Sequence, residues 1–252
     1  MSRPPPSAAD LQRSLEAALR FAHAAGAWIV PATAAAPSAT RGDPRPAQAG
    51  DVSSGALAEA RTAGGGDGGR ALRAVRDDLG DCRRCRLAQG RTHLVFGVGS
   101  PGARLVFVGE GPGEEEDRRG EPFVGRAGKL LDRMLGAIGL DRSRAYIANV
   151  VKCRPPGNRT PLPDEAQACM PFLWGQLEAI GPAAVCALGA CAAQNLLGTD
   201  TAISRLRGRV HRVRGIPVVP TFHPAYLLRN PAAKRQAWED LKRLQALASE
   251  GS

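Results

Sequence analysis

From about residue 105 onward, short apolar runs alternate regularly with longer amphipathic segments. The apolar runs lie at 105–109, 145–151, 183–188 and 216–220 and have the length of buried strands. The amphipathic segments lie at 128–138, 164–180, 190–197 and 231–248, and Asp164 stands at an N-cap position. Residues 210–214 are compatible with a hairpin before the last strand. This alternation predicts an α/β fold whose sheet is mostly parallel and is covered by helices on both faces.

The first seventy residues differ sharply from the rest of the chain. They are rich in Ala, Gly, Pro, Ser and Thr, in runs such as PATAAAPSAT and TAGGGDGG. Such a composition buries too little apolar surface to offset the entropy of ordering the chain. We therefore expect a disordered tail over 1–70, with room for a short helix at 9–25, and a folded domain over 71–252.

The net charge of +10 is concentrated in that folded domain. Residues 1–70 contain seven arginines and six acidic residues, which leaves about +9 for the remainder. A basic domain suggests a polyanionic partner, although charge alone leaves nucleic acid and a merely soluble basic surface equally open. Charged residues interrupt every long apolar run, so we expect no membrane span and no secretory signal. These features predict a cytoplasmic protein.

Three polar residues stand directly after predicted strands, namely Glu110, Asn149 and His223. Each has a commoner explanation when taken alone: a surface carboxylate, a turn-forming amide or a histidine beside a proline. In open parallel sheets, however, ligands bind outside the carboxyl ends of the strands. Their shared placement predicts one crevice that contains a carboxylate, an amide and an imidazole.

A glycine-rich loop, Gly109-Glu110-Gly111-Pro112-Gly113, follows the first apolar run. It lacks the G-x-G-x-x-G spacing, Pro112 removes a backbone donor, and four acidic residues follow at 114–117. Because those carboxylates would repel a diphosphate, a nucleotide cofactor is disfavoured. The glycines instead allow the backbone to approach a flat ligand closely. Phe123 is a candidate aromatic face for that ligand, although a core position is the commoner fate of a phenylalanine.

Four cysteines have the pattern of a metal centre. Cys82 and Cys85 form a C-x-x-C pair, Cys153 follows a predicted strand, and Cys169 lies in the next helix. Four thiolates suit zinc or an iron–sulfur cluster, and the spacing alone leaves both open, together with a redox pair accompanied by core cysteines. We expect Cys186 and Cys191, which lie in apolar surroundings, to be core thiols.

Longer motifs resemble a known family. The segments CRRCRLAQGRTHLVFGVG, VFVGEGPGEEED, EPFVGRAGKLLDRML, YIANVVKCRPPGNRTPLPDEAQAC and TFHPAYLLRNP are similar, in this order, to those of family 4 uracil-DNA glycosylases. The resemblance covers about residues 79–245. It implies a three-layer α/β/α fold around a four-stranded, mostly parallel sheet. It also implies a 4Fe-4S cluster held by Cys82, Cys85, Cys153 and Cys169.

The same resemblance implies a base-excision repair enzyme that flips uracil out of single- or double-stranded DNA and hydrolyses its N-glycosidic bond. It assigns the uracil pocket to Glu110, Gly111, Pro112, Phe123, Asn149 and His223. Phe123 would stack on the base, and the amide of Asn149 would pair with N3–H and O4, a pattern that cytosine lacks. His223 and loop N–H groups would stabilise charge on O2, while Glu110 and Glu116 are candidates for orienting the attacking water, Glu110 being favoured.

Contacts to the DNA are expected from two basic segments. Leu228, beside Leu227 and Arg229, would fill the gap left by the flipped base, and Arg154, Arg159 and Arg229 are candidates for phosphate contacts. Each of these arginines is otherwise an ordinary surface residue. We expect a monomer associated with the nucleoid, whose tail is either a plain extension or a docking segment for a replication or repair protein.

Two departures from related enzymes also matter. Gly111 stands where the best-known uracil-DNA glycosylases place a water-activating Asp, and residues 152–158 lack the histidine of a variant that crosslinks to DNA, so no crosslink is expected. The alternatives are a non-catalytic iron–sulfur DNA-binding protein and a glycosylase for another deaminated base, such as hypoxanthine.

Overall fold

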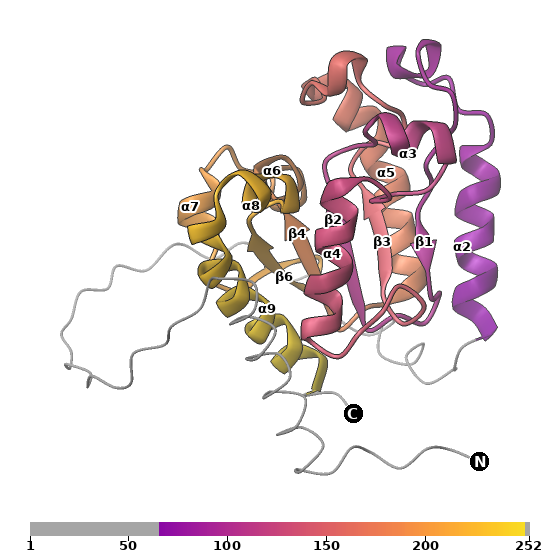
Figure 1. The fold of residues 1–252 in the computed structure, drawn as a ribbon. Coiled ribbons are helices and arrows are strands. Elements are labelled where there is room, and N and C mark those ends of the chain that lie inside the picture. The colour runs from indigo at the N-terminus through magenta and orange to yellow at the C-terminus, as the bar shows by residue number, and fades with distance from the viewer. Residues whose placement is uncertain (1–65, 250–252) are drawn as a thin grey trace, which may run out of the picture.

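A computed structural model describes residues 66–249, which form a three-layer α/β/α domain around one sheet (Figure 1). The sheet has six strands in the order β1-β3-β2-β4-β6-β5. The strands are β1 (Val98–Gly99), β2 (Leu105–Gly109), β3 (Tyr146–Asn149), β4 (Ala184–Leu188), β5 (His211–Val213) and β6 (Ile216–Thr221). The four inner strands are parallel, whereas β1 and β5 pair antiparallel at the two edges.

The expected count of four strands is therefore wrong for the whole sheet, although it matches the parallel centre. The edge strands β1 and β5 have two and three residues, too few to produce an apolar run that periodicity can detect. The expected hairpin is confirmed, because β5 and β6 are joined by the two-residue turn Arg214–Gly215.

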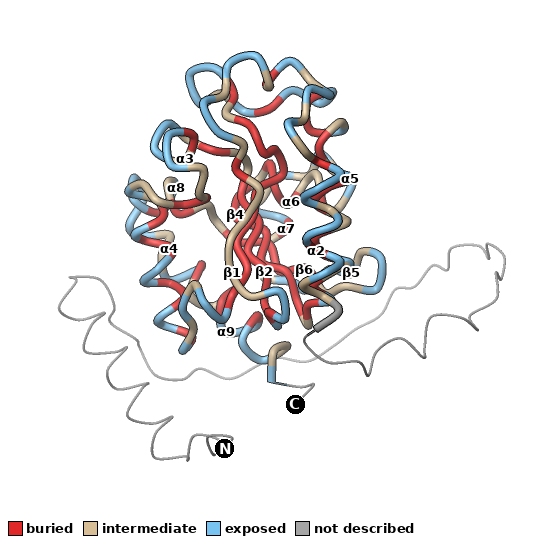
Figure 2. The backbone as a smooth tube through the Cα atoms, turned by 90° about the vertical axis from the view of Figure 1, so that its right-hand side faces the viewer, coloured by how far each residue is buried: buried red, intermediate tan, exposed pale blue. Residues whose placement is uncertain are grey.

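Helices cover both faces of the sheet (Figure 2). One face packs against α2 (Gly66–Leu79), α5 (Pro163–Ile180), α6 (Ala190–Leu197) and α7 (Ile203–Leu206). The other face packs against α4 (Arg126–Ala137), α8 (Pro224–Arg229) and α9 (Lys234–Ser249). Along β2, Val106 and Val108 point to the first face and Leu105 and Phe107 to the second, the period-two alternation of a strand buried on both sides.

Several boundaries differ from the sequence-based expectations. Asp164 is not an N-cap: α5 begins at Pro163, whose fixed φ suits a first helical position, and Glu165 accepts a hydrogen bond from the N–H of the capping residue Leu162 at 2.8 Å. The closing helix is preceded by a separate 3-10 turn, Pro231–Ala233. The short helices α3 (Glu114–Arg119), α7 and α8 were not predicted, because four to six residues carry little periodic signal.

The start of α2 at Gly66 lies before the boundary expected at residue 70. The rest of the predicted tail, including the short helix at 9–25, lies outside the described residues. Cys186 and Cys191 are buried, as expected of core thiols, and burial raises the pKa of both. No helix in the described part of the chain is long and apolar enough to cross a bilayer.

Candidate active site

Parallel register brings the predicted polar residues to one edge of the sheet. Gly109 at the end of β2 is the register partner of Asn149 at the end of β3. The pairing continues beyond both strands, because Val150 N–H donates to the Gly109 carbonyl (2.9 Å) and Val151 N–H to the Glu110 carbonyl (3.1 Å). The glycine-rich loop therefore runs alongside the residues that follow β3.

Asn149 and Phe123 converge on Gly109. A Cβ built at residue 109 would lie 2.5 Å from Asn149 Oδ1 and 2.5 Å from Phe123 Cζ, distances that real Cβ contacts do not show. Only glycine leaves room for both side chains here. The prediction that these residues share one site is consistent with this geometry.

The amide of Asn149 is the one anomaly in the hydrogen bonding of this site. The residue is 2% exposed, and its Oδ1 has no hydrogen-bond partner among the described residues. A buried acceptor without a partner costs about 1–3 kcal/mol, and native structures retain few of them. An oxygen kept in this state is poised to accept a hydrogen bond from a ligand.

His223 lies beside the ring of Phe123, with the ring centroids 5.6 Å apart and tilted by 32°. His223 is the N-cap of α8, and its Nδ1 accepts a hydrogen bond from Ala225 N–H at 3.1 Å. Burial lowers the pKa of His223 to about 4, with the charge of Arg229 acting in the same direction and Glu116 opposing it. The imidazole is therefore neutral at pH 7 and carries its proton on Nε2, which makes that atom a donor.

Gly189 makes this position of His223 possible. Gly189 has φ +93°, and a Cβ there would lie 2.9 Å from the Cβ of His223. It stands directly after β4, and its N–H donates to the Thr221 carbonyl of β6 at 2.8 Å. The end of a fourth strand therefore helps to shape the same edge.

Glu110 supplies the carboxyl group of the site. Its side chain is half-buried, and burial raises its pKa, an effect that a hydrogen bond with Thr160 partly offsets. The next residues close the loop against β3: a Cβ at Gly111 would lie 2.7 Å from Val151 Cγ2, and Pro112 is buried.

Glu116 ties two loops of the site together. Its carboxylate accepts hydrogen bonds from Gly113 N–H (3.1 Å), Val124 N–H (2.9 Å) and Gly125 N–H (2.9 Å). The glycine-rich loop and the Phe123 loop are thus joined through one side chain. These contacts favour a loop-positioning role for Glu116 over direct contact with water, and the sequence did not suggest this role.

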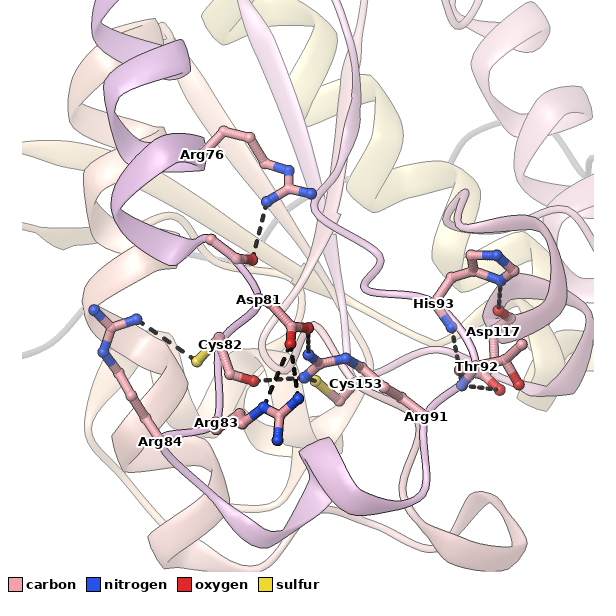
Figure 3. A network of polar contacts seen from close by, with 11 residues as sticks. Arg76, Asp81, Cys82, Arg83, Arg84, Arg91, Thr92, His93, Asp117 and Cys153 are labelled. Carbon is pink, nitrogen blue, oxygen red and sulfur yellow. Dashed lines mark hydrogen bonds and ion pairs between the residues drawn. The ribbon is translucent and has the colours of Figure 1, made fainter.

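Its neighbour Asp117 reaches in the opposite direction, toward the cysteine region. The buried Asp117 carboxylate accepts hydrogen bonds from Thr92 N–H at 2.9 and 3.1 Å, and its carbonyl lies 2.9 Å from His93 Nδ1 (Figure 3). The acidic run at 114–117 forms the first turn of α3, and this short helix connects the two regions.

The four predicted cysteines come from three separate segments. Cys82 and Cys85 follow α2, Cys153 follows β3, and Cys169 lies in α5. Burial raises the pKa of Cys169; the charge and backbone N–H of Lys152 oppose this, and the thiols of Cys85 and Cys82 raise the pKa further. The thiols thus lie within electrostatic range of one another.

Arginine N–H groups point at two of these sulfurs (Figure 3). Arg91 Nη1 donates to Cys153 Sγ at 3.3 Å and to the Cys82 carbonyl at 2.6 Å, and Arg84 Nη1 donates to Cys82 Sγ at 3.7 Å. Positively charged N–H donors beside cysteine sulfur atoms stabilise the anionic thiolate form. Within residues 66–249, no three or more His, Cys, Asp or Glu side chains are arranged to hold one metal ion.

Lys152 connects the cysteine region to the pocket, a role that no local sequence pattern indicated. Its side chain is fully buried, and Nζ donates to the Asn149 carbonyl (2.8 Å) and to Gln176 Oε1 (2.6 Å). Gln176 Nε2 in turn donates to the Phe96 carbonyl at 2.9 Å and to Tyr146 Oη at 3.1 Å. From the sequence, a lysine within a basic stretch is expected to lie at the surface. Lys152 is buried instead, because α5 packs on β3.

Comparison with known proteins identifies the family. The Uracil DNA glycosylase superfamily model matches residues 96–242 of this chain. The chain belongs to this superfamily.

Relatives named "Type-4 uracil-DNA glycosylase" match most of the folded part of the chain. The protein from Thermotoga maritima is 47% identical over 176 residues, which cover 68% of this chain and 92% of that protein. The one from Archaeoglobus fulgidus is 46% identical over 178 residues, covering 68% and 89%. The one from Sulfurisphaera tokodaii is 42% identical over 186 residues, covering 70% and 84%. The resemblance drawn from the motifs is confirmed.

The residues expected to contact DNA differ in their exposure to solvent and in their contacts within the protein. Leu228 is 39% exposed and Arg229 is also exposed, both on the short helix that His223 caps, whereas Leu227 is buried. Arg154 Nε donates to Asn158 Oδ1 at 2.7 Å. Arg159 forms a two-pronged ion pair with the buried Glu165, at 2.7 and 2.8 Å, so its guanidinium holds the loop before α5.

Proposed function

We propose that this chain is a monofunctional uracil-DNA glycosylase of DNA repair, which flips uracil out of DNA and hydrolyses its N-glycosidic bond. The observation that carries the proposal is the buried, unpartnered Oδ1 of Asn149 beside the ring of Phe123. Extrusion of the base costs a few kcal/mol, which contacts in such a pocket repay.

Recognition of uracil follows from the donor and acceptor pattern. Uracil N3–H donates to Asn149 Oδ1, and uracil O4 accepts from the amide nitrogen. Cytosine presents an acceptor at N3 and a donor at C4, so both positions would be left unpaired. A site built to hydrogen-bond its substrate rejects the mismatched analogue by a factor of about 10⁴–10⁵. Phe123 stacks on the face of the flipped ring.

The chemical step requires stabilisation of a departing uracil anion and of an oxocarbenium-like sugar. The Nε2–H of neutral His223, with N–H groups of the loop at Glu110 and Gly111, stabilises the charge that grows on O2. The carboxylate of Glu110 orients the attacking water and takes its proton as the bond to C1′ forms. Glu116 contributes by holding the two loops in register.

On the DNA, Leu228 fills the space left by the flipped base, and Arg154 and Arg229 contact phosphates. Arg159 supports this surface by anchoring the loop through Glu165. We also propose that the chain acts as a monomer in the cytoplasm at the nucleoid, with the part of the predicted tail that precedes α2 available for a replication or repair protein. Light scattering on the purified chain, free and DNA-bound, tests the monomer.

We further propose that Cys82, Cys85, Cys153 and Cys169 hold a 4Fe-4S cluster. The sulfur donor set and the arginine N–H groups aimed at it fit such a group. When bound, the cluster supplies a structural cross-link between the segment after α2 and the loop between β3 and α5. Cys169→Ser should lose iron and the broad visible absorption, whereas Cys186→Ser, a matched change at a buried core thiol, should keep both.

The decisive assay uses oligonucleotides with one uracil, single- and double-stranded, followed by alkali to cleave abasic sites. We expect free uracil, cleavage only after alkali and no covalent adduct. Oligonucleotides that stay intact although the enzyme binds them and contains iron would favour a non-catalytic DNA-binding protein. Preferential release of hypoxanthine would favour the glycosylase for another deaminated base.

A further inference from the structure

Phe123 adopts a backbone conformation that bulky residues avoid. Its φ is +55°, and the only other non-glycine residues with positive φ in the described part of the chain are Asn158 and Arg214. Asparagine tolerates this region, and Arg214 lies in a two-residue hairpin turn that requires it. Phe123 instead follows Pro122, at the turn position where positive φ normally selects glycine. A large ring at such a position needs support from its surroundings.

Arg142 provides that support from the turn after α4. Its Nη1 donates to the Pro122 carbonyl at 3.0 Å, and its Nη2 donates to the Phe123 carbonyl. The guanidinium is itself held by Asp132, which accepts from Nε at 2.7 Å, and by Glu121 at 3.4 Å. The planar fork thus binds two successive carbonyl groups, which a lysine ammonium cannot match in geometry.

Gly128 in α4 confines the same peptide unit from the other side. A Cβ at this position would lie 1.7 Å from the Phe123 carbonyl oxygen, so only glycine allows the carbonyl to sit there. Glu116 accepts from the N–H of Val124, the next residue. The turn is therefore clamped at consecutive backbone groups, and the ring of Phe123 is directed at Gly109 and His223.

We propose that Arg142 is a positioning residue for uracil binding, which acts by holding Phe123 in the left-handed conformation that forms the aromatic wall of the pocket. The proposal rests on the proposed function, because it assumes that Phe123 stacks on the flipped base. Within the described residues, the hydrogen bonds of Arg142 all go to 121–123 and α4. Release of the Phe123 carbonyl lets the turn relax toward negative φ, and the ring then leaves its place beside Asn149.

A double-mutant cycle on uracil release separates this role from a general structural one. Arg142→Gln should lower kcat/KM about tenfold and raise the inhibition constant of free uracil, because stacking is weakened. Phe123→Leu should have a similar effect. The double variant should be little worse than Phe123→Leu alone, since Arg142 then has no ring to position.

Two further variants complete the test. Arg142→Lys keeps the charge beside Asp132 but not the planar fork. Its kcat/KM should therefore lie between those of the wild type and Arg142→Gln, and its melting temperature should be near wild type. This variant also provides the test if Arg142→Gln folds poorly. Arg144→Gln removes a neighbouring arginine that pairs with Asp141 and the Gly139 carbonyl, and should leave uracil release unchanged.

Additive losses in the double variant, or wild-type uracil inhibition in both Arg142 variants, would overturn the positioning role while leaving the glycosylase assignment intact. Absence of uracil release by the wild-type enzyme would instead overturn the proposed function itself.

Discussion

Two buried polar side chains, Asn149 in the pocket and Asp240 in α9, differ in how far their hydrogen-bonding capacity is satisfied. Asp240 accepts hydrogen bonds from Thr221 Oγ1 (2.8 Å), Arg207 Nε and Nη2 (both 3.0 Å) and Gly208 N–H (3.1 Å). Asn149 Oδ1 accepts none among the described residues. The satisfied group stabilises the fold, whereas the unsatisfied one costs stability that a ligand recovers.

The two side chains also serve neighbouring parts of the site. The network of Asp240 holds the end of β6 at Thr221, two residues before His223, and Arg207 lies over the ring of Phe222 at 5.2 Å. The pocket therefore adjoins a region in which the buried carboxylate is fully hydrogen-bonded.

The sharpest test of this comparison is Asn149→Ala. Uracil release should fall about 10³-fold, because the hydrogen bond made to the departing base is lost. The melting temperature should stay the same or rise, since the deleted oxygen has no partner to lose. Single-turnover excision measures the rate of uracil release, and thermal unfolding measures the melting temperature. A fall in melting temperature as large as that of Asp240→Ala would contradict the difference proposed between the two side chains.

Asp240→Ala should show the reverse pattern. Loss of a buried, multiply bonded carboxylate leaves Arg207 without its partner and should lower the free energy of unfolding by about 3 kcal/mol. Well below the melting temperature, uracil release should remain near wild type. Glu239→Ala, a neighbouring change in the exposed pair with Lys242, is the control. A large fall in uracil release, measured at a temperature where the variant is still folded, would place Asp240 in the catalytic machinery.

Glu110→Gln tests a carboxyl group that lies between Asn149 and Asp240 in its hydrogen bonding, because it is half-buried and hydrogen-bonded with Thr160. If this carboxylate orients the attacking water, kcat should fall about 10²-fold with little change in KM. The matched change Glu114→Gln, at an exposed acid of the same segment, should leave kcat unaltered. Equal kcat values for the two variants would remove Glu110 from the chemical step.

The smallest effect concerns pH and His223. Burial lowers its pKa to about 4, below the usual value of about 6.5. Between these values the unfolded chain binds a proton that the folded chain does not, so His223 makes stability decline as the pH falls from 6.5 toward 4. His223→Gln should therefore flatten the pH dependence of the unfolding free energy in this window. His211→Gln is the control, and an unchanged slope in His223→Gln would refute the neutral imidazole.

Much of the site could be predicted from local patterns. The strand that ends at Gly109, just before Glu110, was visible as an apolar run, and register alone places it beside Asn149. In the sequence, the acidic run at 114–117 indicated a barrier to diphosphate, and the family resemblance added Glu116 as a candidate for orienting water. In the structure, Glu116 and Asp117 bond to the backbone of two different loops, and no local pattern encodes such partners.

The order of strands and helices, and the side chains that stand at the strand ends, were determined by the sequence itself, because apolar periodicity sets which face of each segment is buried. Only the tertiary structure decided their chemical state. Asn149 Oδ1 is unpaired, His223 is neutral, and Phe123 is clamped by Arg142 nineteen residues further along the chain. These states depend on desolvation and on partners distant in sequence, and both arise only when the layers pack.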